Sequence, residues 1–194
     1  GETRPMHNFV LLPLLVLLAC LLAGLYGALH DQVSYSISPE YFSTFKFDQF
    51  EVPHHLRGRW GVAMVGWMAS WWMGVFIGIP LGTVALILPE RKAYLGHGMI
   101  ACGVVMLTAL AFAAVGQAER TTDEERGRYW VPASVTDVDA FHRVGKMHER
   151  SYQGGYTGLA TGAAYLVTAG IVLRRRRQNL AGERESTSLP GAPA

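Results

Sequence analysis

The chain has 194 residues, half of them hydrophobic, and a formal net charge of +2 at pH 7. This length fits one domain, and the near-balanced charge gives no basis for a nucleic-acid partner. Its two cysteines, Cys20 and Cys102, both fall in apolar stretches. That placement excludes a disulfide framework, CxxC redox chemistry and a cysteine-based zinc site.

Four stretches are almost free of charge, and each is long enough to cross a membrane. They are 9–29, 61–88, 94–118 and 156–173. A bilayer core about 30 Å thick needs roughly 20 apolar residues in a helix. The sequence therefore predicts an all-α fold, an integral membrane four-helix bundle over 1–177 with long extracytoplasmic segments at 30–60 and 119–155. The polar residues 178–194 predict a disordered cytoplasmic tail.

The first stretch has to be distinguished from a cleaved signal peptide. A signal peptide has an apolar core of about 7–15 residues followed by a cleavage site made of small residues. Residues 9–29 exceed that length, and no Ala-x-Ala pattern precedes His30. We therefore expect a retained membrane helix.

Basic residues near the ends of the spans predict the orientation, because cytoplasmic loops are rich in Lys and Arg. Four consecutive arginines, 174–177, follow the fourth stretch directly, and Arg4, Arg91 and Lys92 agree with them. We expect both termini in the cytoplasm of a bacterium, with the protein in the inner membrane. The arginine run would then contact anionic lipid.

Polar and aromatic residues follow the first stretch in the run ALHDQVSYSISPEYFSTFKFDQF, residues 28–50. We expect the first helix to end at His30 and Asp31. Ser38-Pro39-Glu40 combines an N-cap residue, a proline at the first helical position and an acid in the first turn, which predicts a short helix. The aromatic residues of this run are typical of a membrane interface.

Small residues recur at every fourth position in the second and fourth stretches. They are Gly66, Ser70, Gly74, Gly78 and Gly82 in the second, and Gly154, Gly158 and Gly162 in the fourth. Such stripes allow membrane helices to approach closely, so we expect these two helices to pack on each other. The alternative is that glycine is simply common in membrane helices. Pro80 removes one backbone amide, which predicts a bend in the second helix.

Residues 136–153 predict an amphipathic helix that continues into the fourth span. Its small or apolar face comprises Phe141, Val144, Gly145, His148, Tyr152 and Gly155; its charged face comprises Asp139, His142, Lys146, Glu149 and Gln153. We therefore expect His148 to face the bundle and His142 to face solvent.

Ionisable residues near three helix ends are expected to converge at the external face. They are His30, Asp31, Glu40, Glu119 and His148, supported by Ser34 and Tyr152. Such groups inside a membrane bundle are costly and are usually paired or functional. Imidazole nitrogens and carboxylate oxygens suit zinc, iron, copper or manganese, so we interpret the group as a candidate transition-metal site. The alternatives are a metal-free hydrogen-bonded network, a helix C-terminal role for His30 and a solvated loop around Glu119.

Other chemistries lack their motifs. There is no GxSxG elbow, no phosphate-binding loop and no CxxCH for covalent haem. Haem held by His30 and His148 is disfavoured because ligands near the interface would leave the macrocycle partly wet. No catalytic constellation is complete, so two classes stay open: a metal-dependent redox enzyme or sensor, and a non-catalytic accessory subunit. An accessory subunit would dock on a larger membrane complex, or on a second copy, through its glycine stripes and interfacial aromatics.

The run LHDQVSYSISPEYFSTFKFDQF, with MHERSYQGGY at 147–156, resembles small uncharacterised four-span bacterial membrane proteins with an HDxxSYxxSxEYF-like junction. The resemblance covers only these two junctions and carries no activity, so no functional residue follows from it. It does imply that the two junctions belong to one site.

Overall fold

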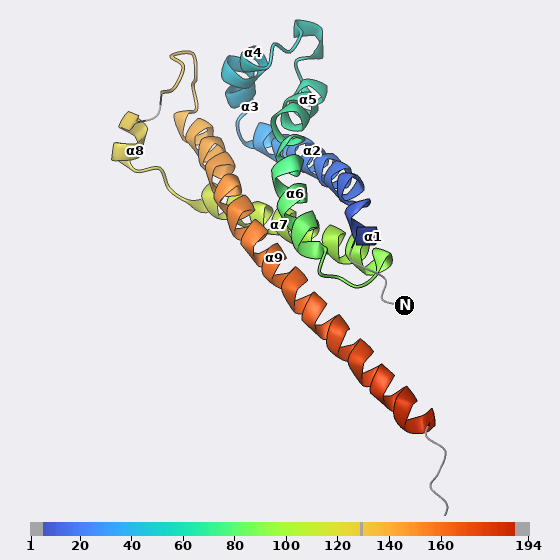
Figure 1. Ribbon diagram of the computed structural model, residues 1–194. Helices are drawn as coiled ribbons and strands as arrows, with labels where there is room; N and C mark the ends of the chain where they lie inside the picture. The colour runs from blue at the N-terminus through green and yellow to red at the C-terminus, as the bar shows by residue number, and fades with distance from the viewer. Residues whose placement is uncertain (1–5, 129, 189–194) are drawn as a thin grey trace, which may run out of the picture.

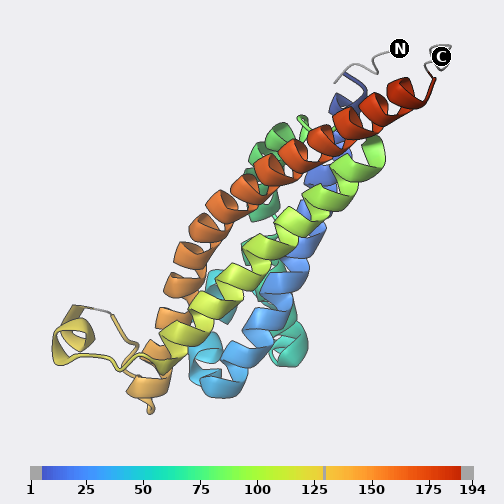
Figure 2. The same ribbon diagram turned by 90° about the horizontal axis from the view of Figure 1, so that it is seen from below.

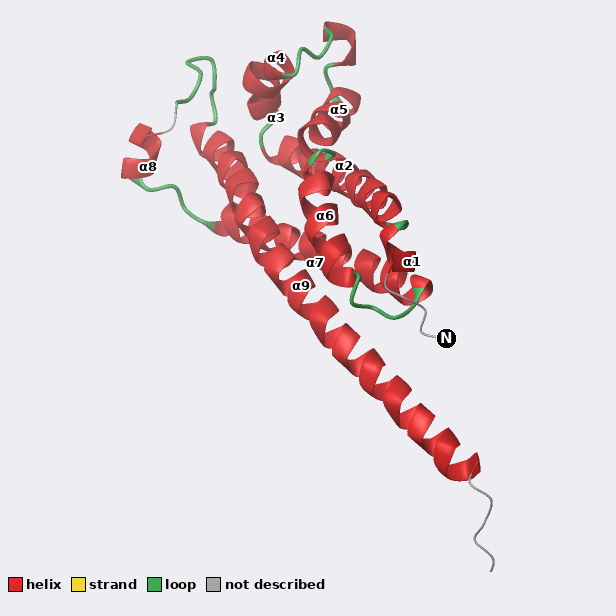
Figure 3. Cartoon of the chain, viewed as in Figure 1, coloured by secondary structure: helices red, strands yellow, loops and turns green. Residues whose placement is uncertain are grey.

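The computed structural model describes residues 6–128 and 130–188, and all regular structure in this part of the chain is helical (Figure 3). In chain order, the α-helices are α1 (Met6–Phe9), α2 (Leu12–Ile37), α3 (Pro39–Tyr41), α4 (Phe47–Gln49), α5 (Arg59–Ser70), α6 (Met73–Ala85), α7 (Arg91–Ala118), α8 (Asp123–Arg128) and α9 (Val138–Ser188). A π-helical turn, Phe42–Lys46, joins α3 to α4, and a 3-10 turn, His54–Leu56, precedes α5.

Three helices, α2, α7 and α9, are long and apolar enough to cross a membrane, as expected for a membrane protein. The predicted span at 61–88 consists of two helices, α5 and α6, which together are long and apolar enough for one span but meet at an angle of 43°. The bend lies at Trp71 and Trp72, whereas Pro80 lies inside α6, so the bend predicted at this proline is misplaced. Backbone hydrogen bonds between residues close in sequence bridge this break: the amide of Gly74 donates to the carbonyl of Trp71 at 3.1 Å.

The first long helix does not end at His30 and Asp31. Helix α2 continues to Ile37, and the backbone becomes extended only at Ser38. The following residue is Pro39, whose ring disfavours the helical conformation in the residue before it. The short helix predicted from Ser38 is confirmed: the Ser38 hydroxyl oxygen accepts a hydrogen bond from the amide of Tyr41 at 3.3 Å.

The small-residue stripes do not pack on each other as expected. A Cβ added at Gly74 would overlap the backbone of Cys20 on α2, and one at Gly78 would come within 2.8 Å of the Val16 Cα. The α9 stripe lies instead against α7, where a Cβ at Gly158 would come within 2.7 Å of the Val105 Cα. Each stripe therefore faces the long helix that precedes it in the chain, which pairs α5 and α6 with α2, and α9 with α7.

The helices place α1 and the C-terminal part of α9 at one end of the molecule, with the α6–α7 loop (Figures 1 and 2). We call this the α1 end. Helices α3, α4 and α8 and the start of α9 lie at the other end, the α8 end (Figure 2). At the α1 end, the Asn8 amide donates to the Leu88 carbonyl at 2.8 Å, and Arg174 donates to Ile87 at 3.2 Å. These bonds fasten the chain's two ends to one loop.

Two apolar clusters hold the helices together. The larger one lies between the long helices and includes Leu15, Leu81, Tyr94, Val105 and Leu166. The smaller, more aromatic cluster lies at the α8 end and includes Tyr41, Phe42, Phe47, Phe141 and Val144. It fixes the start of α9 against α2 and the segment after it.

Helix α9 is continuous through Gly154 and Gly155, as predicted for an amphipathic segment that runs into the fourth span. It also continues past Gln178, where a disordered tail was expected, and is helical to Ser188. Residues 189–194 of that predicted tail lie outside the described residues.

Candidate metal centre

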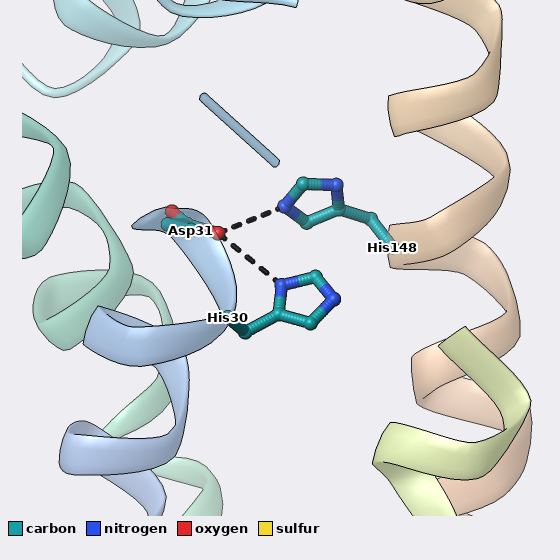
Figure 4. A group of neighbouring side chains, drawn as sticks. All are labelled: His30, Asp31 and His148. Carbon is teal, nitrogen blue, oxygen red and sulfur yellow. Dashed lines mark hydrogen bonds and ion pairs between the residues drawn. The ribbon is translucent and has the colours of Figure 1, made fainter. Parts of the chain in front are cut away.

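Three side chains meet at the α8 end of the bundle. His30 and Asp31 lie on α2, and His148 reaches toward them from α9 (Figure 4). One carboxylate oxygen, Oδ1 of Asp31, lies 3.0 Å from Nε2 of His148 and 3.4 Å from Nδ1 of His30. One potential ligand atom from each residue lies within 4.8 Å of the other two. These three of the five predicted ligands therefore come together.

The group is removed from solvent. His30 is 7% exposed and Asp31 is 4% exposed, and His148 is partly buried. Nε2 of His30 is buried and has no hydrogen-bond partner. Buried polar atoms are nearly always hydrogen-bonded, since leaving one unpaired costs about 1–3 kcal/mol. This nitrogen could therefore take a hydrogen bond or a ligand from a molecule that enters the site.

The contacts of His148 constrain the protons on its ring. Its Nδ1 lies 2.8 Å from the carbonyl oxygen of Val144, which can only accept, so Nδ1 carries a proton. Nε2 faces a carboxylate oxygen of Asp31 at 3.0 Å. Two lone pairs at this distance would repel, and either a proton or a metal ion shared by these two atoms would remove that repulsion.

Aromatic rings orient both imidazoles. The Tyr26 ring stacks on His30 with centroids 5.6 Å apart, and the Tyr41 ring stacks on His148 at 5.4 Å. The two imidazoles meet edge to face, with centroids 4.9 Å apart. Each histidine is thus held between a tyrosine and the other histidine. The sequence analysis did not assign Tyr26 to the site, although it lies one helical turn before His30, the spacing at which side chains share a helix face.

Two of the three spacings between potential ligand atoms are close to those of a transition-metal site, and the third, between the two histidines, is within 4.8 Å. In a tetrahedral zinc site with bonds of about 2.0–2.1 Å, neighbouring ligand atoms lie about 3.3 Å apart. The two distances from Asp31 to the histidines are 3.4 and 3.0 Å. The hydrogen bond from His148 to a backbone carbonyl is also the usual way in which a metal-binding histidine is oriented. Three protein ligands leave one coordination position for water or a substrate.

The other two predicted ligands have structural partners. Both carboxylate oxygens of Glu40 accept bonds from the segment before α9, including the amide of Asp137 at 3.0 Å and the hydroxyl of Thr136 at 2.7 Å. The bonds from Asp137 and Thr136 hold the pKa of Glu40 below its ordinary value. Glu119 forms an ion pair with Arg150 at 2.7 Å. Neither joins the group around Asp31.

The two predicted supporting residues are near the group but do not bond to its side chains. Ser34 is fully buried, and its hydroxyl donates to the backbone carbonyl of His30 at 3.2 Å. Tyr152 is exposed for half of its surface and lines the cavities described below.

The helical phase predicted for the start of α9 is partly wrong. Phe141 and Val144 are buried as expected, but so are His142 and Lys146, which were placed on the solvated face. The segment between α7 and α9 folds over this face, and the Lys146 ammonium donates to the carbonyl of Arg120 at 2.8 Å. The periodicity of the sequence could not predict this burial, because it does not show that the segment between α7 and α9 folds back over a face of α9.

Two cavities adjoin the group. The first, which we call the core cavity, has a volume of about 130 Å³ and extends from His30 and Asp31 between the long helices. The second, the vestibule, has a volume of about 600 Å³ and lies toward the α8 end. His148, Lys46 and Tyr152 line both. The candidate site therefore lies at the boundary between the core cavity and the vestibule.

Lys46 is the cation at this boundary, and it was not assigned to the site from the sequence. Its ammonium group donates to the Gln49 side chain at 3.0 Å and lies 4.9 Å from the centre of the Phe45 ring. Burial lowers the pKa of Lys46, and the negative charge of Asp31 partly offsets this. These contacts hold the Lys46 ammonium near the Asp31 carboxylate, but Lys46 is not one of the three candidate metal ligands.

No protein-family model, curated protein or solved structure matches this chain at a significant level.

Proposed function

We propose that the chain is a multi-pass protein of a bacterial inner membrane with both termini in the cytoplasm. We further propose that His30, Asp31 and His148 bind one first-row transition metal ion on the extracytoplasmic side. The observation that carries the metal assignment is the sharing of one buried Asp31 oxygen by ring nitrogens from two helices, at 3.4 and 3.0 Å.

Three further features support metal binding. A charged group in a membrane bundle is costly unless it is paired or binds an ion, and Asp31 is almost fully buried. The donor set, two imidazoles and a carboxylate, suits zinc and iron. His148 is already oriented by the Val144 carbonyl, with Nε2 directed at the shared oxygen.

The basic residues support the orientation. The Arg174–177 run and the α6–α7 loop with Arg91 lie at the α1 end, away from the candidate metal site. Basic residues favour the cytoplasmic side. The ion would therefore be acquired from outside the cytoplasm, and the vestibule offers the path to it.

The test is elemental analysis of protein purified in mild detergent, followed by titration of the metal-free protein with Zn²⁺ and Fe²⁺. We expect one ion per chain in the wild type. His30→Ala and His148→Ala should each abolish stoichiometric metal, because losing one ligand from a set of three removes much of the affinity. His148→Gln serves as a second variant, since an amide can still bond to Asp31 but is a poor metal ligand.

His55→Ala is the matched control, because His55 is exposed in the loop before α5 and should leave the metal content unchanged. A wild type that neither carries nor takes up a metal ion would overturn the metal assignment. The three residues would then form a proton-bridged network.

A further inference from the structure

The core cavity has the size of one six-membered ring. Its volume is about 130 Å³. For comparison, an engineered protein cavity of about 150 Å³ binds benzene. Most of the wall is apolar and includes Ala23, Ile77, Val105, Met106 and Leu159. A wall of this kind favours a flat, apolar ligand over an ion or a sugar.

Several polar residues also line this wall, and two of their groups have hydrogen-bonding capacity left over. One is Nε2 of His30, which is buried and unpartnered. The other is the pair formed by the Tyr26 and Ser151 hydroxyls, 2.7 Å apart, of which only one proton is used in their mutual bond. Tyr26 and His30 are one helical turn apart, about 6 Å along the axis. Because the Tyr26 ring stacks on the His30 ring with centroids 5.6 Å apart, the two polar groups lie close together and can bond to one edge of a ring in the cavity.

The cavity has a mouth on the side of the bundle. Two of its lining residues are well exposed: Phe76 on α6 at 63% and Tyr156 on α9 at 70%. Both belong to helices that are candidate membrane spans. Ser70 and Met73, on either side of the break between α5 and α6, also line the cavity. Interrupted helices at membrane depth are tolerated where they border a protein cavity, which fits a functional space here.

We infer that the core cavity binds the head group of a membrane quinol or quinone, entering between α6 and α9 while its hydrocarbon tail stays in the lipid. His30 Nε2 accepts from a quinol hydroxyl or donates to a quinone carbonyl. The Tyr26–Ser151 pair supplies a hydroxyl beside this contact. The inference shares with the proposed function only the placement in a membrane. A metal ion bound at Nδ1 of His30 leaves Nε2 with the ring proton, so that in the metal-bound protein Nε2 donates to the quinone carbonyl.

The experiment uses the full chain in lipid nanodiscs and a benzoquinone that carries a decyl tail and a photoreactive azido group. Light should attach the probe to residues that line the core cavity, located by mass spectrometry of the digested protein. Excess unlabelled decylbenzoquinone should prevent the labelling. Attachment spread along all lipid-facing helices, without protection by the competitor, would overturn the inference.

A cavity-filling variant tests the same site by affinity. Gly155 lines the cavity, and a Cβ added there meets no atom within 4 Å, so Gly155→Leu should fold and occupy the ligand space. We expect it to reduce labelling about tenfold or more, which corresponds to about 1.4 kcal/mol of binding free energy. Gly103→Leu is the matched control, since its Cβ is equally unhindered and it is not among the residues lining the cavity. Equal labelling of Gly155→Leu and wild type would refute the site.

Decylbenzene, which has the ring and tail but no oxygens, tests the polar contacts. It should compete about tenfold less well than decylbenzoquinone, because its ring leaves His30 Nε2 unpaired. Equal competition would mean that the cavity takes any apolar ring, and the quinol assignment would fall. Metal content is measured on the same samples: Gly155→Leu should keep its ion, so failure here is distinguishable from failure of the metal proposal.

Discussion

The two ends of the bundle use similar polar residues for different purposes. At the α1 end, two polar side chains each bond to a single partner: Asn8 bonds to the Leu88 carbonyl at 2.8 Å, and His97 bonds to the Tyr165 hydroxyl at 2.6 Å, while the buried Tyr94 hydroxyl has none. At the α8 end, two histidines share one oxygen of Asp31, and one ring nitrogen of His30 stays unpartnered.

The difference shows that a histidine between membrane helices is not by itself a sign of a site. His97 joins α7 to α9 with a hydrogen bond that occupies one ring nitrogen and is a complete structural explanation. Around Asp31, the ring nitrogens of the two histidines outnumber the acceptor atoms that they contact. A buried polar atom without a partner is energetically costly. Convergence on one acceptor, rather than the presence of histidine, separates the candidate ligand site from a structural contact.

The largest expected effect concerns which side of the membrane each end occupies. Ser43 is exposed near the α8 end, and Ala181 is exposed on the part of α9 beyond the arginine run. In intact cells, Ser43→Cys should react with a membrane-impermeant thiol reagent, whereas Ala181→Cys should react only after lysis. Labelling is read by gel shift, with the wild type reporting any reaction of Cys20 and Cys102.

Reaction of both cysteines from outside would remove the opposition between the two ends. Reaction of Ala181→Cys alone would reverse it, and the candidate metal site would then face the cytoplasm, although its geometry would be unaffected.

The next effect is on stability at the α8 end. His148→Ala removes the partner at 3.0 Å from a carboxylate that is almost fully buried. Asp31 then keeps only the longer contact with His30 at 3.4 Å, so the loss should approach the cost of about 3–5 kcal/mol for a buried charge that has lost its partner. We expect a loss of this size in the free energy of unfolding of the metal-free protein, measured by reversible denaturation in detergent and followed by helical circular dichroism.

At the α1 end, Tyr165→Phe should cost only about 1 kcal/mol, the usual contribution of one neutral hydrogen bond. It removes the hydroxyl that His97 contacts at 2.6 Å and keeps the ring. Metal content should not change. A loss equal to that of His148→Ala would show that both histidine contacts are ordinary structural bonds, and the contrast between the ends would disappear.

Much of the contrast between the α1 end and the α8 end could be predicted from the sequence, because hydropathy depends only on residues that are neighbours in the chain. The apolar runs identify α2, α7 and α9, and the placement of His30, Asp31 and His148 at one end follows from the order of the spans. The short helix after Ser38 follows from its N-cap residue and Pro39. These features depend on residues close together in the chain.

Features that depend on the path of a connection could not be predicted in this way. Glu40 was expected to face His30, but it bonds to the Thr136–Asp137 segment, which returns to α3 from a distant part of the chain. His142 has the spacing of a solvated residue and is buried, since the segment that follows α7 covers that face. The partner of each glycine stripe was wrong for the same reason: periodicity identifies a close-packing face but not the helix that it contacts.

The smallest expected effect distinguishes two roles at the α8 end: Glu40 holds the start of α9 in place, whereas other residues are proposed to bind the metal. Bonds from Asp137 and Thr136 hold the pKa of Glu40 below its ordinary value of 4.5. Because the folded-state pKa is lowered, the stabilisation is fully present above pH 4.5 and is lost as the pH falls through the folded-state value. Glu40→Ala should therefore melt below the wild type at pH 7, with the two curves converging in acid, and it should keep its metal ion.

Melting is followed by circular dichroism, with Glu40→Gln as a control that retains an acceptor but does not titrate. A difference that persists unchanged in acid would show that the carboxylate charge does not hold the start of α9, and loss of metal from Glu40→Ala would return this residue to the ligand set.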